Sequence, residues 1–437
     1  MKRKSVRSLG GVGGLWPARW CSLLFGLLIR VTLTGLHPGA PTGTFGIGTA
    51  TYAWTDVDRE EILTIQPGGP RRLMAQVWYP TSRRRGSSAY VDDPDVPRAV
   101  ERAQGLAPVL GFLRSLRSHA RPGAAPVAGP LPVVVYLTGL TGYRQASMFQ
   151  VEELVSHGYV VVGLDQPGMS ATVRFPGGER VAGLAPAVAQ PLINQSITAA
   201  TQPPAINGVP MPHGIIPYLA SDVRFALDKI TDLDAADPQG QLTGLFDLDR
   251  IGIMGISLGG ITGAEACRNE PRLKACLVLD APMTDRVARD GLRQPAMWIT
   301  RRADVMRAER AQTGGWSDED IARQQQTVTS AYLASTRSWL VEIQGIFHVE
   351  FTDVPFGSPL IDLLLSGPLP GRRAHQIVNA CTVEFFDQTL RERGSRLLAG
   401  DTSNLPEVSI TSHASGSAAS PQDAPGLDGA REHGNRG

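Results

Sequence analysis

The segment Arg250-Ile-Gly-Ile-Met-Gly-Ile-Ser-Leu-Gly-Gly260 decides the fold. Its apolar first half predicts a strand up to Gly255, and a helical stretch follows from Leu258 to Asn269. Ser257 stands in the turn, between Gly255 and Gly259. Such a turn strains the backbone of the serine and brings strand and helix so close together that only glycine leaves enough room. The segment therefore predicts that the Ser257 hydroxyl projects from the turn as a candidate nucleophile.

Strand-like and helix-like segments alternate on both sides of this turn, from about Thr44 to Leu398. The middle strands are near-continuous runs of Val, Ile and Leu, which is typical of strands buried on both faces of a parallel sheet. Other strands are expected at Leu73–Tyr79, Pro132–Leu137, Tyr159–Leu164, Lys274–Asp280, Pro295–Arg301 and Ser338–Gln344. Other helices are expected at Arg144–His157, Ile216–Thr231, Ser317–Ala334 and Arg372–Arg393, of which the third opens with a capping-box pattern. Together these features predict an α/β-hydrolase fold, with a mostly parallel central sheet and helices on both faces.

The domain organisation follows from where this alternation stops. We expect one catalytic domain over residues 41–398, preceded by a leader at 1–40. Residues 81–130 and 170–215 lack a clear period and are rich in Pro, Gly and Ala, so they are expected as long excursions over the edge or top of the sheet. Residues 399–437 turn to Ser, Gly, Ala, Asp and Pro and are expected to form a disordered tail.

Composition limits the classes of function. Hydrophobic residues make up 42% of the 437 residues, enough for a sizeable core, and the formal net charge of +1 creates no overall field that favours nucleic acid. None of the four cysteines forms a C-x-x-C pair and no calcium-loop pattern is present, so we expect no metal site and no other cofactor. A disulfide among Cys267, Cys276 and Cys381 remains an open alternative. The composition indicates no particular oligomeric state.

The N-terminus has the features of an export signal. Basic residues at the start precede an apolar run from Trp20 to Ile29, which Arg30 interrupts, and Ala40 is a candidate cleavage position. The run is too short and too broken to indicate a membrane-spanning helix. We therefore expect an exported or membrane-associated protein. The alternative is a leader without a targeting role on a cytoplasmic enzyme.

A nucleophilic serine needs a histidine base, which in this fold follows the serine and the acid along the chain. His348, His375, His413 and His433 follow Ser257. His413 and His433 lie in the tail, and His375 lies in a helical stretch, where it is expected as a helix-face residue. His348 follows the strand Ser338–Gln344 after a short turn, at the edge of the sheet where such folds collect their catalytic groups. The order and position therefore favour His348 as the base.

The residues alone leave two candidates for the acid that orients this base. Asp280 ends the strand that follows the nucleophile strand, and Asp304 follows the next strand along the chain. Both positions place a carboxylate at the same edge of a parallel sheet. Asp353, close after His348, is expected instead as a carboxylate that caps a loop.

The chain resembles the plasma-type platelet-activating factor acetylhydrolases, a family of lipid esterases with bacterial relatives. The resemblance spans roughly residues 37–395, and its order and spacing make it specific. It rests on Pro41–Gly48, Val77–Pro80, Val133–Leu140, Val155–Val160, Gly255–Gly260, Leu279–Pro282 and Phe347–Asp353. Two positions depart from the family pattern: Thr138 stands where a histidine is usual, and so does Ile256. Neither is a member of the predicted triad, but both could alter the shape of the pocket.

This resemblance implies a Ser257–Asp280–His348 triad, because the family's acid lies in a Leu-Asp-Ala context, as Asp280 does. It also implies that the backbone amides of Leu258 and Leu140 form the oxyanion hole. The implied activity is hydrolysis of short or oxidised sn-2 acyl chains of phospholipids through an acyl-enzyme, without a metal.

Two other functions compete with this expectation. One is a general carboxylesterase or polyester hydrolase of the same fold, and the other is a non-catalytic binding protein with an α/β-hydrolase fold.

An apolar patch between Leu106 and Leu116, flanked by arginines, could contact a membrane surface or could be a helix packed on the body of the domain.

Overall fold

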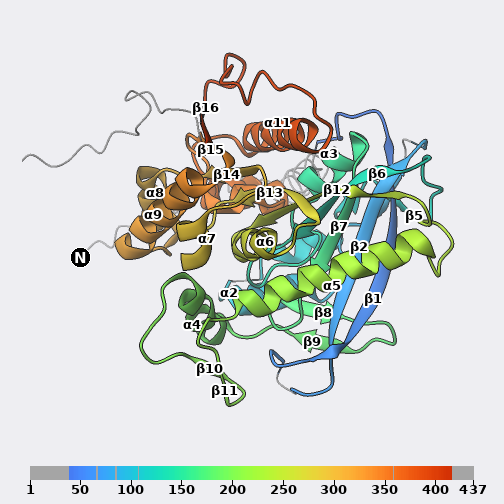
Figure 1. The fold of residues 1–437 in the computed structure, drawn as a ribbon, viewed down its shortest axis with the longest axis horizontal. Coiled ribbons are helices and arrows are strands. Elements are labelled where there is room, and N and C mark those ends of the chain that lie inside the picture. The colour runs from blue at the N-terminus through green and yellow to red at the C-terminus, as the bar shows by residue number, and fades with distance from the viewer. Residues whose placement is uncertain (1–38, 65–66, 84–85, 107, 358, 416–437) are drawn as a thin grey trace, which may run out of the picture.

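A ten-stranded mixed sheet runs through the centre of the molecule in the computed structural model (Figure 1). The structure describes residues 39–64, 67–83, 86–106, 108–357 and 359–415. The strands, in spatial order, are β16 (Val408–Ala414), β15 (Arg337–Ile343), β14 (Ala296–Thr300), β13 (Leu273–Leu279), β12 (Phe246–Ile256), β6 (Leu131–Leu137), β7 (Val160–Asp165), β2 (Pro70–Thr81), β1 (Gly46–Glu60) and β5 (Ala120–Pro122). Strands β15 to β7 pair in parallel. The pairs β16–β15, β2–β7 and β1–β2 are antiparallel, and β5 pairs with β1 in parallel.

Helices cover both faces of this sheet, because successive residues of each buried strand point to opposite sides. Val133 and Val135 of β6 pack with α5 (Ile216–Ala235), α6 (Leu258–Asn269) and part of α9 (Asp318–Ala334). Val134 and Tyr136 pack on the other face with α3 (Met148–Ser156) and α11 (Gly371–Leu390). The mostly parallel sheet with helices on both faces confirms the predicted fold class.

The seven strands and five helices expected from the sequence are present, with ends that differ by a few residues. The predicted capping box at the start of α9 forms, since Ser317 Oγ accepts from the Asp320 N–H and the Asp320 carboxylate accepts from the Ser317 N–H. The 15-residue strand β1 was not expected, although its residues from Ala50 to Asp56 alternate between buried and exposed. Antiparallel pairing with β2 along almost its whole length holds it in place.

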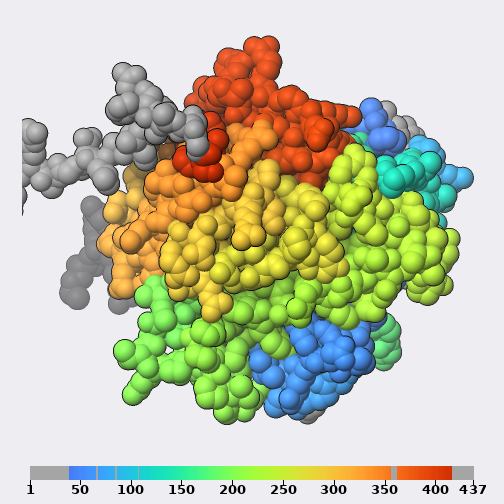
Figure 2. Space-filling model, in the orientation of Figure 1, coloured from blue at the N-terminus to red at the C-terminus, as the bar shows by residue number. Residues whose placement is uncertain are grey.

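The remaining elements lie mainly in the excursions and in the loops at one edge of the sheet. Residues 81–130 contain β3 (Ser88–Ala89), α2 (Val96–Gln104), the 3-10 helix η1 (Leu110–Arg114), β4 (Arg117–Ser118) and β5. Residues 170–215 contain β8 (Thr172–Arg174), β9 (Arg180–Ala182), α4 (Pro186–Ile197), β10 (Ala205–Ile206) and β11 (Val209–Pro210), and the part around α4 projects at the lower left of Figure 2. The later loops add α7 (Asp285–Asp290), α8 (Ala303–Thr313), η2 (His348–Phe351), η3 (Val354–Gly357) and α10 (Pro359–Leu365).

One expectation from the sequence is corrected, and one open alternative is decided. Disorder from residue 399 onward is wrong for the part that includes β16, which pairs with β15 from Val408 to Ala414 and extends the sheet. The disulfide among Cys267, Cys276 and Cys381 that the sequence left open does not form, because all three are buried free thiols. The predicted leader up to residue 38 and the tail from residue 416 lie outside the described residues. Within the described residues, no helix is both long and apolar enough to cross a membrane.

Candidate active site

Ser257 occupies a strained turn between β12 and α6, as the sequence predicts. Its backbone has φ of 54° and ψ of −121°, in a region that side chains other than glycine rarely adopt. A Cβ at Gly255 would lie 2.3 Å from the backbone of Gly259, and one at Gly259 would lie 2.3 Å from Leu137 O. These two glycines therefore allow α6 to start directly against the ends of β12 and β6, with Ser257 at the apex of the turn.

The structure brings Asp280 and His348 together beside this turn. Asp280 follows β13, and His348 begins η2 a few residues after β15. His348 Nδ1 lies 2.5 Å from Asp280 Oδ2, and Gln324 Nε2 donates to Asp280 Oδ1 over 2.8 Å. The Asp280 side chain is fully buried, whereas that of His348 is 25% exposed. The carboxylate is therefore fixed by two elements, while the imidazole reaches toward solvent.

A buried guanidinium accompanies this carboxylate. Arg301 follows β14, is fully buried, and its Nε lies 2.6 Å from Asp280 Oδ2. Burial alone would raise the Asp280 pKa, but the charge of Arg301 and the contact with His348 outweigh it and hold that pKa well below its usual range. Arg301 and His348 thus favour the ionised form of Asp280.

Asp304, the alternative acid, is not the partner of His348 Nδ1. It sits in the first turn of α8, its side chain is 69% exposed, and it forms an ion pair with Arg302, which is also exposed. The Nδ1 partner of His348 is Asp280.

The loop that carries His348 is tied to the body of the domain by buried carboxylates. Glu350 Oε2 accepts from the backbone N–H groups of Phe347 and Gly367, over 2.7 and 2.9 Å. Asp353 accepts from the N–H groups of Met148 and Phe149 at the start of α3 and from the Tyr90 hydroxyl. Burial raises the pKa of both carboxyl groups to about 7. The expectation that Asp353 caps a loop is corrected: it is a capping carboxylate, but the N–H groups that it accepts belong to the start of helix α3.

His375 is a helix-face residue, as expected. It lies in α11, is buried, and stacks on the Phe149 ring with 3.5 Å between ring centroids. Burial lowers its pKa to about 3, so His375 is neutral in the fold.

The predicted oxyanion amides lie on two segments that approach each other at the turn. Leu258 is the first residue of α6, so its N–H is one of the helix-start amides that lack an intrahelical acceptor. Leu140 lies in a four-residue turn closed by a 3.0 Å bond from Gly142 N to Gly139 O, and Thr141 N donates to Met169 O. The Leu140 N–H takes part in neither bond. A Cβ at Gly139 would lie 3.3 Å from Ser257 Cβ, so this loop passes directly beside the serine.

Four neighbours of the Asp280–His348 pair were not singled out from the sequence: Arg301, Glu309, Gln324 and Trp316. The available signal for Arg301 was its position, since a charged residue directly after a buried parallel strand falls at the edge of the sheet where functional groups gather. The other three come from α8, α9 and the loop between them, whose packing is not readable from local sequence.

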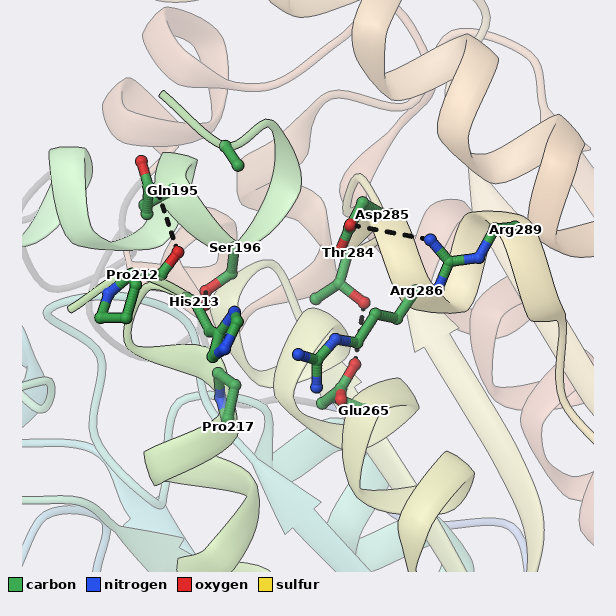
Figure 3. Close-up of a pocket in the computed structure, with 11 residues that line it drawn as sticks. Gln195, Ser196, Pro212, His213, Pro217, Glu265, Thr284, Asp285, Arg286 and Arg289 are labelled. Carbon is green, nitrogen blue, oxygen red and sulfur yellow. Dashed lines mark hydrogen bonds and ion pairs between the residues drawn. The ribbon is translucent and has the colours of Figure 1, made fainter. Parts of the chain in front are cut away.

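A separate cavity of about 170 Å³ opens between α4, the start of α5 and helices α6 and α7 (Figure 3). Arg286 of α7 reaches into it toward His213 and Glu265, as Figure 3 shows. None of the predicted triad residues lines this cavity.

In the described part of the chain, no three His, Cys, Asp or Glu side chains are grouped as a metal site would require.

Comparison with known proteins adds relatives to this geometry. Residues 226–403, which include Ser257, Asp280 and His348, match the family model described as platelet-activating factor acetylhydrolase, isoform II. The platelet-activating factor acetylhydrolases of Canis lupus familiaris and Bos taurus are 22% and 23% identical over 296 and 307 residues. These alignments cover 63% and 64% of this chain and 62% and 64% of the relatives, so the chain spans less than two thirds of their length.

Among solved structures, a ferulic acid esterase from Streptomyces cinnamoneus is similar, with a TM-score of 0.64 and 28% sequence identity. The match covers 86% of this chain and 99% of that structure. The fold places the protein among the α/β hydrolases, and the similar solved structure is that of an esterase. The family model and the two mammalian relatives confirm its resemblance to the platelet-activating factor acetylhydrolase family.

Proposed function

We propose that the protein is a serine esterase that hydrolyses carboxylic esters through an acyl-enzyme on Ser257. The observation that carries this proposal is the 2.5 Å contact between His348 Nδ1 and Asp280 Oδ2, next to a strained serine turn. This contact leaves the other ring nitrogen, Nε2, for the serine hydroxyl.

In the proposed reaction His348 takes the Ser257 proton while Ser257 Oγ attacks the ester carbonyl. The negative charge that develops on the carbonyl oxygen is held by the N–H groups of Leu258 and Leu140. As the tetrahedral intermediate collapses, the bond to the alcohol breaks and His348 gives its proton to the leaving oxygen. Water then attacks the acyl-enzyme with His348 again as the base, which releases the acid and restores Ser257. Asp280 holds the imidazole in the required orientation and stabilises its charged form.

For the substrate, we propose short or oxidised sn-2 acyl chains of glycerophospholipids, as the name of the family model and of the mammalian relatives suggests. A second candidate is a simple or aromatic carboxylic ester, because the similar solved structure is a ferulic acid esterase. Thr138 and Ile256 stand where the acetylhydrolase family usually has histidine. They therefore also support the second candidate, because they could alter the shape of the pocket.

Contact with a membrane surface is part of the phospholipid proposal. The patch at residues 106–116 is only partly packed: Leu110, Leu113 and Leu116 are buried, whereas Leu106 and Val109 are exposed. Arg114, Arg117 and Arg121 are exposed beside it. Export or membrane association through the N-terminal segment also remains a proposal.

A substrate series tests these proposals. Purified protein would be given 1-alkyl-2-acetylglycerophosphocholine, homologues with longer sn-2 chains, p-nitrophenyl esters and methyl ferulate, with Ser257→Ala as the control. The phospholipid proposal expects the highest kcat/KM on the acetyl phospholipid and a steep fall with chain length. Hydrolysis of the simple esters without sn-2 release would contradict it and would favour the second candidate. Wild-type protein without activity on any of these esters would argue for a non-catalytic protein.

A further inference from the structure

Arg301 closes a ring of interactions that holds the His348 base at two points. One point is the imidazole, whose Nδ1 contacts Asp280 Oδ2. The other is the backbone, since the His348 N–H donates to Glu309 Oε1 over 3.2 Å. Arg301 joins these two carboxylates: its Nε lies 2.6 Å from Asp280 Oδ2, and its Nη1 contacts Glu309 Oε2.

The ring is assembled from four separate segments. Asp280 follows β13, Arg301 follows β14, Glu309 lies in α8 and His348 follows β15. Arg301 is fully buried, and its guanidinium carbon lies 5.7 Å from the centre of the Trp316 ring, which also meets His348 edge-on. Gln325 Nε2 donates to the Arg301 carbonyl oxygen. The Arg301 backbone is thus anchored, and its Nη1 is hydrogen-bonded to Glu309, while its Nε faces Asp280 as an ion pair without a hydrogen bond.

The charges in the ring set the field at the imidazole. Asp280 and Glu309 carry two negative charges and Arg301 carries one positive charge, so one negative charge remains beside His348. When His348 takes a proton during catalysis, the ring becomes neutral. A buried guanidinium is suited to this place because it stays charged at any working pH and its fork can bind two carboxylates at once.

From this geometry we propose that Arg301 is a positioning residue, which with Glu309 sets the charge and orientation of the acid–base pair without contacting substrate. The proposal rests on the proposed function of Ser257, Asp280 and His348. Its consequence is that changes to Arg301 and Glu309 should move the pH dependence of the reaction in opposite directions.

The experiment measures kcat/KM against pH on a p-nitrophenyl ester for wild type, Arg301→Met, Glu309→Gln and the double variant. Arg301→Met leaves two negative charges beside the imidazole, so the acidic limb should move up by about one pH unit. Glu309→Gln leaves Asp280 and Arg301 with no net charge, so the limb should move down by a similar amount. The double variant restores one net negative charge, and its limb should return close to that of wild type.

Arg302→Met is the matched control, because Arg302 is the next residue but is exposed and pairs with Asp304. Its limb should not move. Arg301→Lys keeps the charge but not the fork, so it should lower kcat/KM about 10-fold with little shift of the limb. If Arg301→Met does not fold, Glu309→Gln and Arg301→Lys still test the proposal.

The proposal is overturned if the variants lose activity equally at all pH values and their limbs stay in place, because that result indicates a purely structural role. Failure of the proposed function is a different outcome, in which wild-type protein itself has no esterase activity.

Discussion

Two aspartate–arginine pairs lie at neighbouring strand ends, and they differ in almost every physical respect. Asp280 and Arg301 are fully buried, 2.6 Å apart, and share contacts with His348 and Glu309. Asp304 and Arg302 are 69% and 59% exposed and 3.3 Å apart. Both aspartates follow parallel strands, so their positions in the sequence look equivalent. Burial and a partner from a distant segment, rather than a place at a strand end, therefore distinguish the candidate acid.

The largest expected effect comes from exchanging each aspartate for its amide. Asp280→Asn should lower kcat about 10³- to 10⁴-fold, because the amide no longer favours the required tautomer or stabilises the charged imidazole. Asp304→Asn should change kcat less than about twofold, since an exposed pair contributes little. Steady-state kinetics on a p-nitrophenyl ester would measure both. Equal losses in the two variants would mean that the contrast between the pairs has no functional meaning.

Asp353 is a third aspartate to compare with Asp280. It is buried and close to His348 in the sequence, but its carboxylate contacts the start of α3 instead of the base. Asp353→Ala removes the acceptor of two helix-start N–H groups and of the Tyr90 hydroxyl. We expect a loss of about 3 kcal/mol in the free energy of unfolding, from the unsatisfied buried donors. Urea titration would measure it. A variant as stable as wild type would show that this cap does not hold the loop of His348.

A smaller effect is expected from His375, the buried counterpart of the partly exposed His348. Its pKa is about 3 in the fold and near 6.5 in the unfolded chain, so the unfolded state binds the extra proton between these values. The stability that depends on neutral His375 is therefore present above pH 6.5 and is lost as the pH falls toward 3. At pH 4.5 this loss is about 2–3 kcal/mol relative to pH 7.5.

His375→Gln should remove most of this pH-dependent loss, although it also removes the stacking on Phe149. Thermal unfolding of wild type and variant at pH 7.5 and 4.5 isolates the effect as a difference of differences. The raised pKa values of Glu350 and Asp353 act in the opposite direction but are common to both proteins. An unchanged difference between the two pH values would contradict the buried neutral state of His375.

These comparisons also show what could be predicted from the sequence. The turn at Ser257 could be predicted because its constraint is local. A strand and a helix that approach this closely need glycine at the contact, and the sequence has Gly255 and Gly259 there. The buried parallel strands are readable from their apolar runs. The strand β16 was missed because its polar residues form a strand by pairing with β15, which no local pattern encodes.

For the candidate site, the choice between Asp280 and Asp304 shows what could not be predicted from the sequence. From residues alone both aspartates were open, and only resemblance to a family favoured Asp280. The partner of His348 depends on how the loop after β15 packs against β13 and α8, segments up to 68 residues apart. The roles of Arg301 and Glu309 could not be predicted from the sequence for the same reason. Their contacts with Asp280, His348 and each other form only in the folded chain.

Reaction with a fluorophosphonate probe tests whether Ser257 is the nucleophile, because such probes modify an activated serine. Intact mass and peptide mapping would be recorded against time for wild type, Ser257→Ala, Asp280→Asn and Asp304→Asn. We predict one adduct per chain, located on Ser257, absent in Ser257→Ala, strongly slowed in Asp280→Asn and formed at the wild-type rate in Asp304→Asn. Unlabelled wild-type protein, or an adduct that persists in Ser257→Ala, would contradict the assignment of Ser257 as the nucleophile.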